Sequence, residues 1–195
     1  MKVIRAVDCR TTPWKNGGGS TTEIAAEPSG ASLDTFDWRV SMAKVASDGP
    51  FSEFPGIDRT LAVIKGSGLL LTIGSNAPVT VEPGSDPVHF AGDIATSARL
   101  IAGEITDLNV MTRRGRFSHR LLRIPESVSC DFDGHNIAVV LPLDSGAAVT
   151  SKRDVAALDH GDAAILVRER DTCFRIAPVG TSGCYLVLLR EHRAD

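Results

Sequence analysis

Short apolar runs, separated by residues that favour turns, recur along most of the chain. Clusters such as Gly49-Pro50, Gly66-Ser67-Gly68 and Ser182-Gly183 divide the runs and supply the backbone angles that tight reversals need. Strands this short and regular, with little helical periodicity between them, predict an all-β sandwich or barrel. We expect a helix only over 152–158. We expect strands at 40–45, 60–64, 69–73, 79–81, 108–112, 137–141, 147–150, 163–167, 173–176 and 185–189.

The chain has a faint two-fold organisation. Each half contains strands, then a Gly-Asp step (Gly92-Asp93 and Gly161-Asp162), and then a pair of strands. The 195 residues suit one large all-β domain or two small ones that share a core. We therefore predict a first lobe of residues 1–115 and a second lobe of residues 116–195.

Two of the expected strand regions have one apolar and one polar face, because successive side chains of a strand point to opposite sides. The polar face of 37–46 carries Arg39 and Ser41. The corresponding face of 105–113 carries Asp107, Asn109, Met111 and Arg113. Such faces either meet water or line the interior of a barrel, where they would build a polar pocket. The alternation by itself favours water.

Composition narrows the class of protein. Apolar residues make up 43% of the chain, charged residues 23%, and the formal net charge is −3, which is typical of a soluble globular protein. The basic turn of Arg113, Arg114 and Arg116 is too short for a nucleic-acid-binding stripe. No apolar run is long enough to span a membrane, and the first residues do not resemble a signal peptide. We therefore expect a cytoplasmic protein with neither a nucleic-acid nor a membrane partner.

The cysteines and histidines do not have the spacing of a metal site. The four cysteines lie far apart without any C-x-x-C motif, which predicts reduced and mostly buried thiols. The five histidines are scattered singly, and no H-x-H, H-x-x-x-H or H-E-x-x-H motif occurs. A metal site would need ligands that converge without any local pair, so we predict none. No G-x-S-x-G nucleophile elbow is present either.

The segment 14–23, WKNGGGSTTE, contains three consecutive glycines, which cost much chain entropy to order. Exposed backbone amides in such a loop can form an anion-binding nest. The order of residues is not that of a phosphate-binding P-loop. A hairpin turn between two strands would also explain the glycines, and the spacing leaves both interpretations open.

Two further segments carry candidate ligand-binding residues. In 49–59, GPFSEFPGIDR, the rings of Phe51 and Phe54 can wall a pocket, and Arg59 can pair with a ligand carboxylate or with a nearby acid such as Asp58. In 107–115, DLNVMTRRG, asparagine and arginine side chains on one face can bind a carbonyl and a carboxylate. An exposed polar face followed by a basic turn is the alternative for that segment.

Three blocks of the first half, taken in order, closely resemble the HutD/Ves family. They are 14–28 (WKNGGGSTTEIAAEP), 38–59 (WRVSMAKVASDGPFSEFPGIDR) and 90–115, which ends in DLNVMTRRG. The second half is similar only in its β-rich character. The resemblance implies an all-β double-barrel cupin, that is, a bicupin of the RmlC-like jelly-roll type. Members of this family occur with histidine-utilisation genes and have no firmly assigned reaction.

The chain departs from metal-dependent cupins, which hold their metal with an H-x-H pair, an acidic residue and a later histidine. The corresponding hairpin of the first lobe, near 55–73, contains no histidine, and the later motif region has only His89. The resemblance therefore implies neither a metal nor another cofactor, and oxygenase or metal-isomerase activity is not carried over.

The resemblance implies a pocket in the first barrel. Strand parity supports the residues on 37–46 and 105–113 independently, whereas Lys15 and Arg59 depend on the motifs alone. The expected ligand-binding residues are Lys15, Asn16, Arg39, Ser41, Phe51, Phe54, Arg59, Asn109, Met111 and Arg113.

We therefore expect this chain to bind a small anionic metabolite of histidine degradation, such as formylglutamate or urocanate. The first alternative is a metal-independent hydrolase or isomerase acting on the same ligand, with Asp107, Glu23 or Asp58 as general base. The second is an interaction protein whose pocket has no role. Cupins often pair through sheet edges, so the fold class also allows a homodimer.

Overall fold

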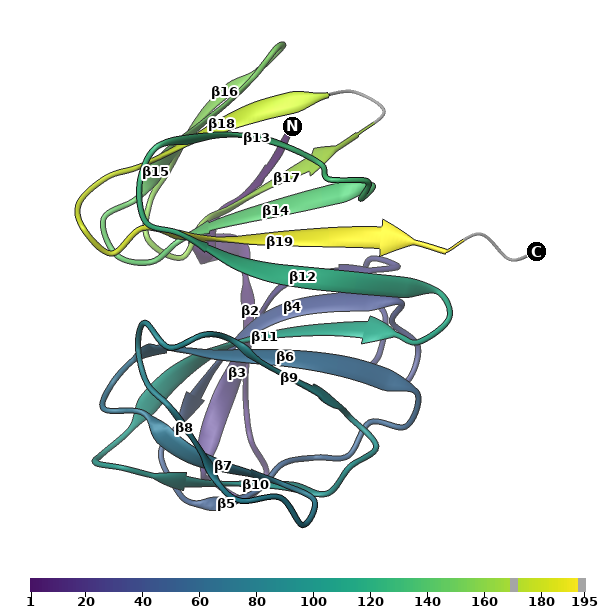
Figure 1. The fold of residues 1–195 in the computed structure, drawn as a ribbon, viewed down its shortest axis with the longest axis vertical. Helices are drawn as coiled ribbons and strands as arrows, with labels where there is room; N and C mark the ends of the chain where they lie inside the picture. The colour runs from purple at the N-terminus through teal and green to yellow at the C-terminus, as the bar shows by residue number, and fades with distance from the viewer. Residues whose placement is uncertain (169–171, 193–195) are drawn as a thin grey trace. The chain divides into compact units, whose positions relative to one another are not determined.

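The structure, a computed structural model, describes residues 1–168 and 172–192 and consists of two compact β-rich units (Figure 1). The first lobe is Arg10–Arg116, and the second lobe is Met1–Cys9 together with Phe117–Asp195. Within the described residues, helical structure is limited to the 3₁₀ turn η1 at Ala6–Asp8. The expected all-β fold is confirmed.

The first lobe contains two antiparallel sheets. The larger has the strand order β2 (Arg10–Pro13), β3 (Gly19–Glu27), β4 (Trp38–Val45), β11 (Ile105–Arg113), β6 (Ile57–Lys65) and β9 (Val88–Ala91). The smaller has the order β5 (Gly49–Pro50), β10 (Thr96–Leu100), β7 (Leu69–Ile73) and β8 (Val79–Val81). Figure 1 shows the smaller sheet facing β6 and β11 of the larger one.

One apolar core joins the two sheets of the first lobe. Leu61 and Val63 of the larger sheet pack in it with Leu69 and Leu71 of the smaller, and all four side chains are buried. The alternation of side chains along each strand produces this arrangement, because residues two apart share the inner face. The inner face of the larger sheet also holds the polar residues described below.

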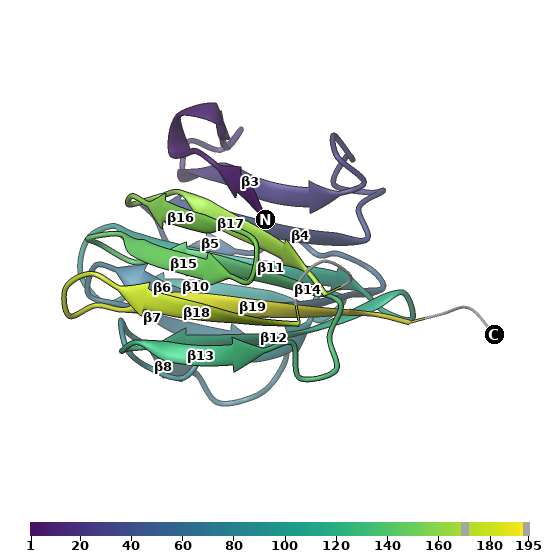
Figure 2. The ribbon, with the colours of Figure 1, turned by 90° about the horizontal axis from the view of Figure 1, so that it is seen from above.

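The second lobe has the same two-sheet plan. Its larger sheet has the order β1 (Lys2–Ile4), β17 (Ala163–Val167), β14 (Ile137–Pro142), β19 (Cys184–Glu191) and β12 (Phe117–Ile124). Its smaller sheet has the order β13 (Val128–Asp131), β18 (Cys173–Pro178), β15 (Ala147–Ser151) and β16 (Val155–Leu158). Figure 2 shows these last four strands running side by side.

The core of the second lobe is built mainly from apolar side chains. It contains aliphatic side chains together with Phe132 and Phe174, whose rings meet edge to face with centroids 5.3 Å apart. Cys184 is buried there, and burial raises the pKa of its thiol to about 11. The prediction of mostly buried cysteines is wrong, because Cys9 and Cys130 are half-buried and Cys173 is exposed. All four are free thiols.

The first nine residues belong to the second lobe, which differs from the expected division at the N-terminus. β1 pairs antiparallel with β17, and Lys2 lies opposite Ile165. Asp162, at the Gly-Asp step before β17, accepts hydrogen bonds from the Ala6 amide at 2.9 Å and from Arg5 Nη1 at 2.6 Å. One buried carboxylate thus fastens the N-terminal segment to its sheet.

Replacing Asp162 with alanine should destabilise the second lobe by about 2 kcal/mol, because the amides of Ala6 and Asp159 would lose their part-buried acceptor. Asp159→Ala is the matched control, since its exposed side chain has the same chemistry in the same turn. Chemical denaturation followed by circular dichroism measures both variants. Equal stability of the two would contradict this role of Asp162.

Two segments of the chain differ from the elements expected from the sequence. The expected helix over 152–158 is wrong, because Val155–Leu158 forms the edge strand β16, which pairs with β15. Strand β3 was not expected, because its sequence, GSTTEIAAE, does not alternate between apolar and polar residues. Among the described residues, no helix is long and apolar enough to cross a membrane.

Candidate functional site

Polar side chains occupy the inner face of the larger sheet in the first lobe. On β11, Met111 lies between Arg39 of β4 and Arg59 of β6. Asn109, two residues before Met111 on β11, lies opposite Ser41 of β4. The barrel interior, not water, surrounds this face, because Arg59 shares its side of β6 with the core residues Leu61 and Val63. Only 1% of the surface of Ser41, 7% of Asn109 and 6% of Arg59 is exposed.

Arg59 is a buried cation enclosed by aromatic rings. Its guanidinium carbon lies 5.2 Å from the ring centre of Phe51, 5.5 Å from that of Phe54 and 5.1 Å from that of Phe90. Such cation–π contacts stabilise the charge when water is excluded. The segment 49–56 carries two of the three rings, those of Phe51 and Phe54.

Within residues 1–168 and 172–192, the hydrogen-bond partners of the Arg59 guanidinium are neutral. Its Nε donates to Asn109 Oδ1 at 3.4 Å, and its Nη1 donates to the Ser52 carbonyl at 3.3 Å; both bonds are long. No carboxylate among the described residues lies within ion-pair distance of it, and Asp58 points to the opposite face of β6. Burial lowers the pKa of Arg59 to about 10; Asp107 raises it and Arg39 lowers it further.

Asp107 lies beside the expected site residues although the sequence did not assign it to the ligand-binding set. It precedes Asn109 by two residues on β11, so both point into the barrel. Its side chain is fully buried, and its Oδ1 has no hydrogen-bond partner. Burial raises the pKa of Asp107 to about 7, although Arg59, the side chain of Asn109 and the backbone of Ala43 all lower it. Strand parity had placed Asp107 on the same face as Asn109, and the sequence offered it only as the general base of the alternative function.

A polar chain leads from this interior toward the surface. Arg39 Nε donates to Glu23 Oε2 at 2.8 Å, and Arg39 Nη1 donates to Ser41 Oγ at 3.1 Å. The Arg39 side chain is 11% exposed and that of Glu23 is 36% exposed, so this ion pair forms the more exposed end of the cluster, which is called the entrance below. β-Bulges interrupt the register next to Glu23 and next to Asp107. Bulges of this kind re-aim side chains and are common beside functional sites.

The structure does not bring Lys15 or Asn16 into this interior cluster. Both are exposed in the hairpin turn between β2 and β3. Asn16 Oδ1 accepts a hydrogen bond from the Gly18 amide at 3.0 Å, which closes the turn. Asn16 and Phe51 do line one small surface pocket together with Trp14. The tri-glycine segment is thus a hairpin turn, as the second of the two interpretations held.

Arg113 also lies apart from Arg59. At the end of β11 its Nε donates to the Phe36 carbonyl at 3.0 Å and its Nη2 to the Asp34 carbonyl at 2.8 Å. The side chain therefore ties down the loop before β4. Although Arg113 shares strand parity with Asn109, no hydrogen bond or ion pair within the described residues joins it to the other interior polar groups.

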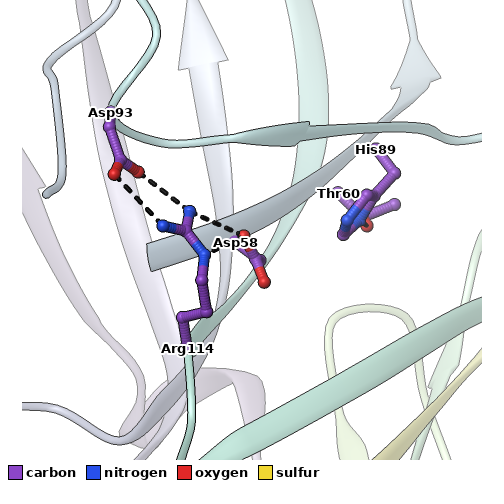
Figure 3. Close-up of polar contacts among 5 residues, drawn as sticks. All are labelled: Asp58, Thr60, His89, Asp93 and Arg114. Carbon is purple, nitrogen blue, oxygen red and sulfur yellow. Dashed lines mark hydrogen bonds and ion pairs between the residues drawn. The ribbon is translucent and has the colours of Figure 1, made fainter. Parts of the chain in front are cut away.

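Figure 3 shows the polar groups on the outer side of the same sheet. Arg114 donates to Asp58 Oδ1 at 2.9 Å and to Asp93 Oδ1 at 3.0 Å, so the acid of the aromatic segment pairs with the basic turn. Thr60 Oγ1 lies 2.9 Å from His89 Nδ1 on the neighbouring strand. Among the described residues no three His, Cys, Asp or Glu side chains are grouped so that they could hold a metal ion.

Comparison with known proteins places this barrel in a family. The family model described as HutD matches residues 6–183. The chain belongs to the HutD family. It is 37% identical over 121 residues to an uncharacterized protein in the hutC 3′ region of Pseudomonas putida, covering 62% of this chain and 63% of that protein. It is 42% identical over 113 residues to Protein Ves of Citrobacter koseri, covering 56% and 58%. The match thus spans less than two thirds of either relative's length.

Solved structures extend the HutD likeness over the whole fold. The structure of HutD from Pseudomonas fluorescens SBW25, in a formate condition, is 30% identical, covers 98% of this chain and 99% of that one, and has a TM-score of 0.84. A cupin 2 conserved barrel domain protein from Leptotrichia buccalis, at 12% identity, covers 93% of this chain and 96% of that one with a TM-score of 0.53. This HutD-family chain therefore has the expected cupin-type fold.

Proposed function

We propose that the first lobe binds a small carboxylate-bearing metabolite inside its barrel and that this metabolite is a product of histidine degradation, such as formylglutamate or urocanate. The observation that carries the proposal is the buried guanidinium of Arg59, which has no carboxylate within ion-pair distance among the described residues. A buried cation held by long, neutral hydrogen bonds is a strong receptor for an anion, because charge-assisted bonds are stronger when water is absent.

The surrounding groups fit an acylated amino acid. Asn109 and Ser41 offer an amide and a hydroxyl beside Arg59, and these can orient a formyl or amide group of the ligand. Arg39 at the entrance can interact with a second acidic group. The location of one relative beside hutC supports a histidine-derived ligand. The second lobe, with its apolar core, offers no comparable cluster in its described residues.

A second function, metal-independent catalysis on the same ligand, is favoured by one observation. Asp107 is a buried acid whose pKa is raised to about 7, and a pKa near the working pH suits a general base. Incubation of the protein with formylglutamate, followed by chromatography of the products, distinguishes the two functions. Unchanged ligand would support binding alone, and stoichiometric excess of product would establish turnover.

The proposed function predicts a ligand-dependent thermal shift that requires Arg59. Histidine, urocanate, formylglutamate and glutamate form the test set. A specific ligand at about one hundred times its Kd adds roughly 2.7 kcal/mol of stability. Arg59→Met should abolish this gain while it preserves the aliphatic volume of the side chain. Arg99→Met, the same change at an exposed position of β10, is the matched control and should keep it. Absence of any shift in the wild type, or its persistence in Arg59→Met, would overturn the proposal.

A further inference from the structure

Few charged side chains lie inside the first barrel, and they differ in whether they form an ion pair. Arg39 and Glu23 pair with each other at the entrance, with 2.8 Å between Nε and Oε2. The buried Asp37 lies with the outer turn, where it pairs with Arg116 at 3.1 Å. Among the described residues of the lobe, Arg59 and Asp107 are then the remaining charges of the interior. Among the described residues these two side chains interact with each other electrostatically rather than through a direct hydrogen bond, and Asn109 lies beside both.

The position of Asp107 is a poor one for a negative charge. Its Oδ1 has no hydrogen-bond partner among the described residues, although the Asn109 side chain and the Ala43 backbone hydrogen-bond to the carboxyl group. Ala43 of β4 and Val63 of β6 are its neighbours across the sheet. The strands of the opposing sheet contribute the apolar side chains Leu69, Leu71 and Ala98 to the same core. Among the described residues, Arg59 is the cation whose field lowers the pKa of this carboxyl, and a buried carboxylate with one unsatisfied oxygen is costly.

We infer that the barrel binds one carboxylate group of its ligand together with one proton, which Asp107 takes up. The inference rests on the proposed function and names the charge state of the ligand and its coupling to pH. A ligand carboxylate beside Arg59 would place two negative charges near one guanidinium in a medium of low dielectric constant. Protonation of Asp107 removes one of them, so the interior remains neutral before and after binding.

The coupling has a definite sign and size. Burial raises the pKa of Asp107 to about 7, so the free protein already carries this proton in acidic solution and has lost it in alkaline solution. Binding above that pKa must therefore recover a proton from solvent. The affinity for a carboxylate should fall about tenfold for each pH unit above roughly 7, and it should be nearly constant below it.

Other titrating groups do not produce the same dependence. The carboxyl groups of the ligand, with pKa values near 4, stay ionised over this range. Of the groups facing Asp107, Arg59 keeps its charge over this range because its pKa is about 10, and Glu23 is paired with Arg39. His89 contacts Thr60 on the outer side of β6, away from the barrel interior (Figure 3).

Isothermal titration calorimetry of the full chain with N-formyl-L-glutamate tests the inference. Titrations at about pH 6 and pH 8.5, each in two buffers with different ionisation enthalpies, give both the affinity and the number of protons taken up. For the wild type we expect close to zero protons at the lower pH, close to one at the higher, and a more than tenfold weaker affinity there. Asp107→Asn should bind without proton uptake and with one affinity at both values. Asp93→Asn, a surface acid beside Arg114, should behave as the wild type does.

The outcomes separate the inference from the proposed function. Binding by the wild type with a pH-independent affinity, or an equal slope in Asp107→Asn, would overturn the proton coupling and leave the binding function intact. Absence of binding at about pH 6 in both proteins would overturn the binding function for this ligand and the inference with it. Loss of the slope in Asp107→Asn alone supports both.

Discussion

Replacing Asp107 with asparagine should remove most of the pH dependence of the first lobe's stability between about pH 4 and pH 8. The pKa of Asp107 is about 7 in the folded protein, against an ordinary value of 3.8 for an aspartate. The folded state therefore holds a proton that the unfolded state releases. The contribution of Asp107 to the free energy of unfolding is fully present below about pH 4 and is lost as the pH rises through 7. A shift of about three pKa units corresponds to roughly 4 kcal/mol.

The two tryptophans of the chain, Trp14 and Trp38, both lie in the first lobe, so denaturation followed by their fluorescence reports on this lobe. The wild type should lose on the order of 3–4 kcal/mol over that range, and Asp107→Asn should lose little. Asp93→Asn is the control, because Arg114 lowers the pKa of Asp93 and its contribution is lost only in acid. Parallel curves for wild type and Asp107→Asn would show that the buried carboxyl does not titrate near neutrality.

Strand parity identified much of the interior cluster, but it could not choose between water and a barrel interior. The alternation of Arg39 and Ser41 with apolar neighbours is the same in a half-buried sheet. The deciding feature is the smaller sheet, whose Leu69 and Leu71 close over the polar face. That closure depends on contacts between strands far apart in sequence, which no local pattern encodes.

The sequence also could not predict the side-chain partners of the segment 49–59. Asp58 and Arg59 are adjacent, so they point to opposite faces of β6, and Asp58 meets Arg114 across the sheet instead. Arg113 follows the parity of Asn109 but lies where β11 ends, and the loop containing Asp34 draws its side chain away. Strand parity predicts the direction of a side chain reliably inside a strand but not at the last residue of the strand.

The N-terminal strand illustrates a different limit. β1 is three residues long and pairs with residues of β17 that lie more than a hundred positions away, as Lys2 does with Ile165. A run of this length carries no periodicity that could be recognised. Its partner is instead determined by the Gly-Asp step, where Asp162 provides acceptors for the backbone that follows β1.

The tri-glycine segment gives the second large prediction. Gly19→Ala should destabilise the first lobe by about 3 kcal/mol or more, because an alanine Cβ there would lie 2.1 Å from the Lys44 carbonyl oxygen and 3.0 Å from the Trp14 ring. The carbonyl belongs to β4, which pairs with β3 along its length, so it cannot retreat without breaking that pairing. Fluorescence-detected denaturation measures the loss.

Gly49→Ala is the matched control, since a Cβ at that position meets nothing within 4 Å and the backbone is not in the left-handed region. It should be neutral, or stabilising by up to about 1 kcal/mol through the unfolded state. Gly18→Ala should fall between the two, because the Cβ would press on Ser47 Oγ at 2.5 Å, and a hydroxyl can rotate away. This order of effects would show that packing within the chain requires the glycines. Equal effects at positions 19 and 49 would contradict this packing requirement at Gly19.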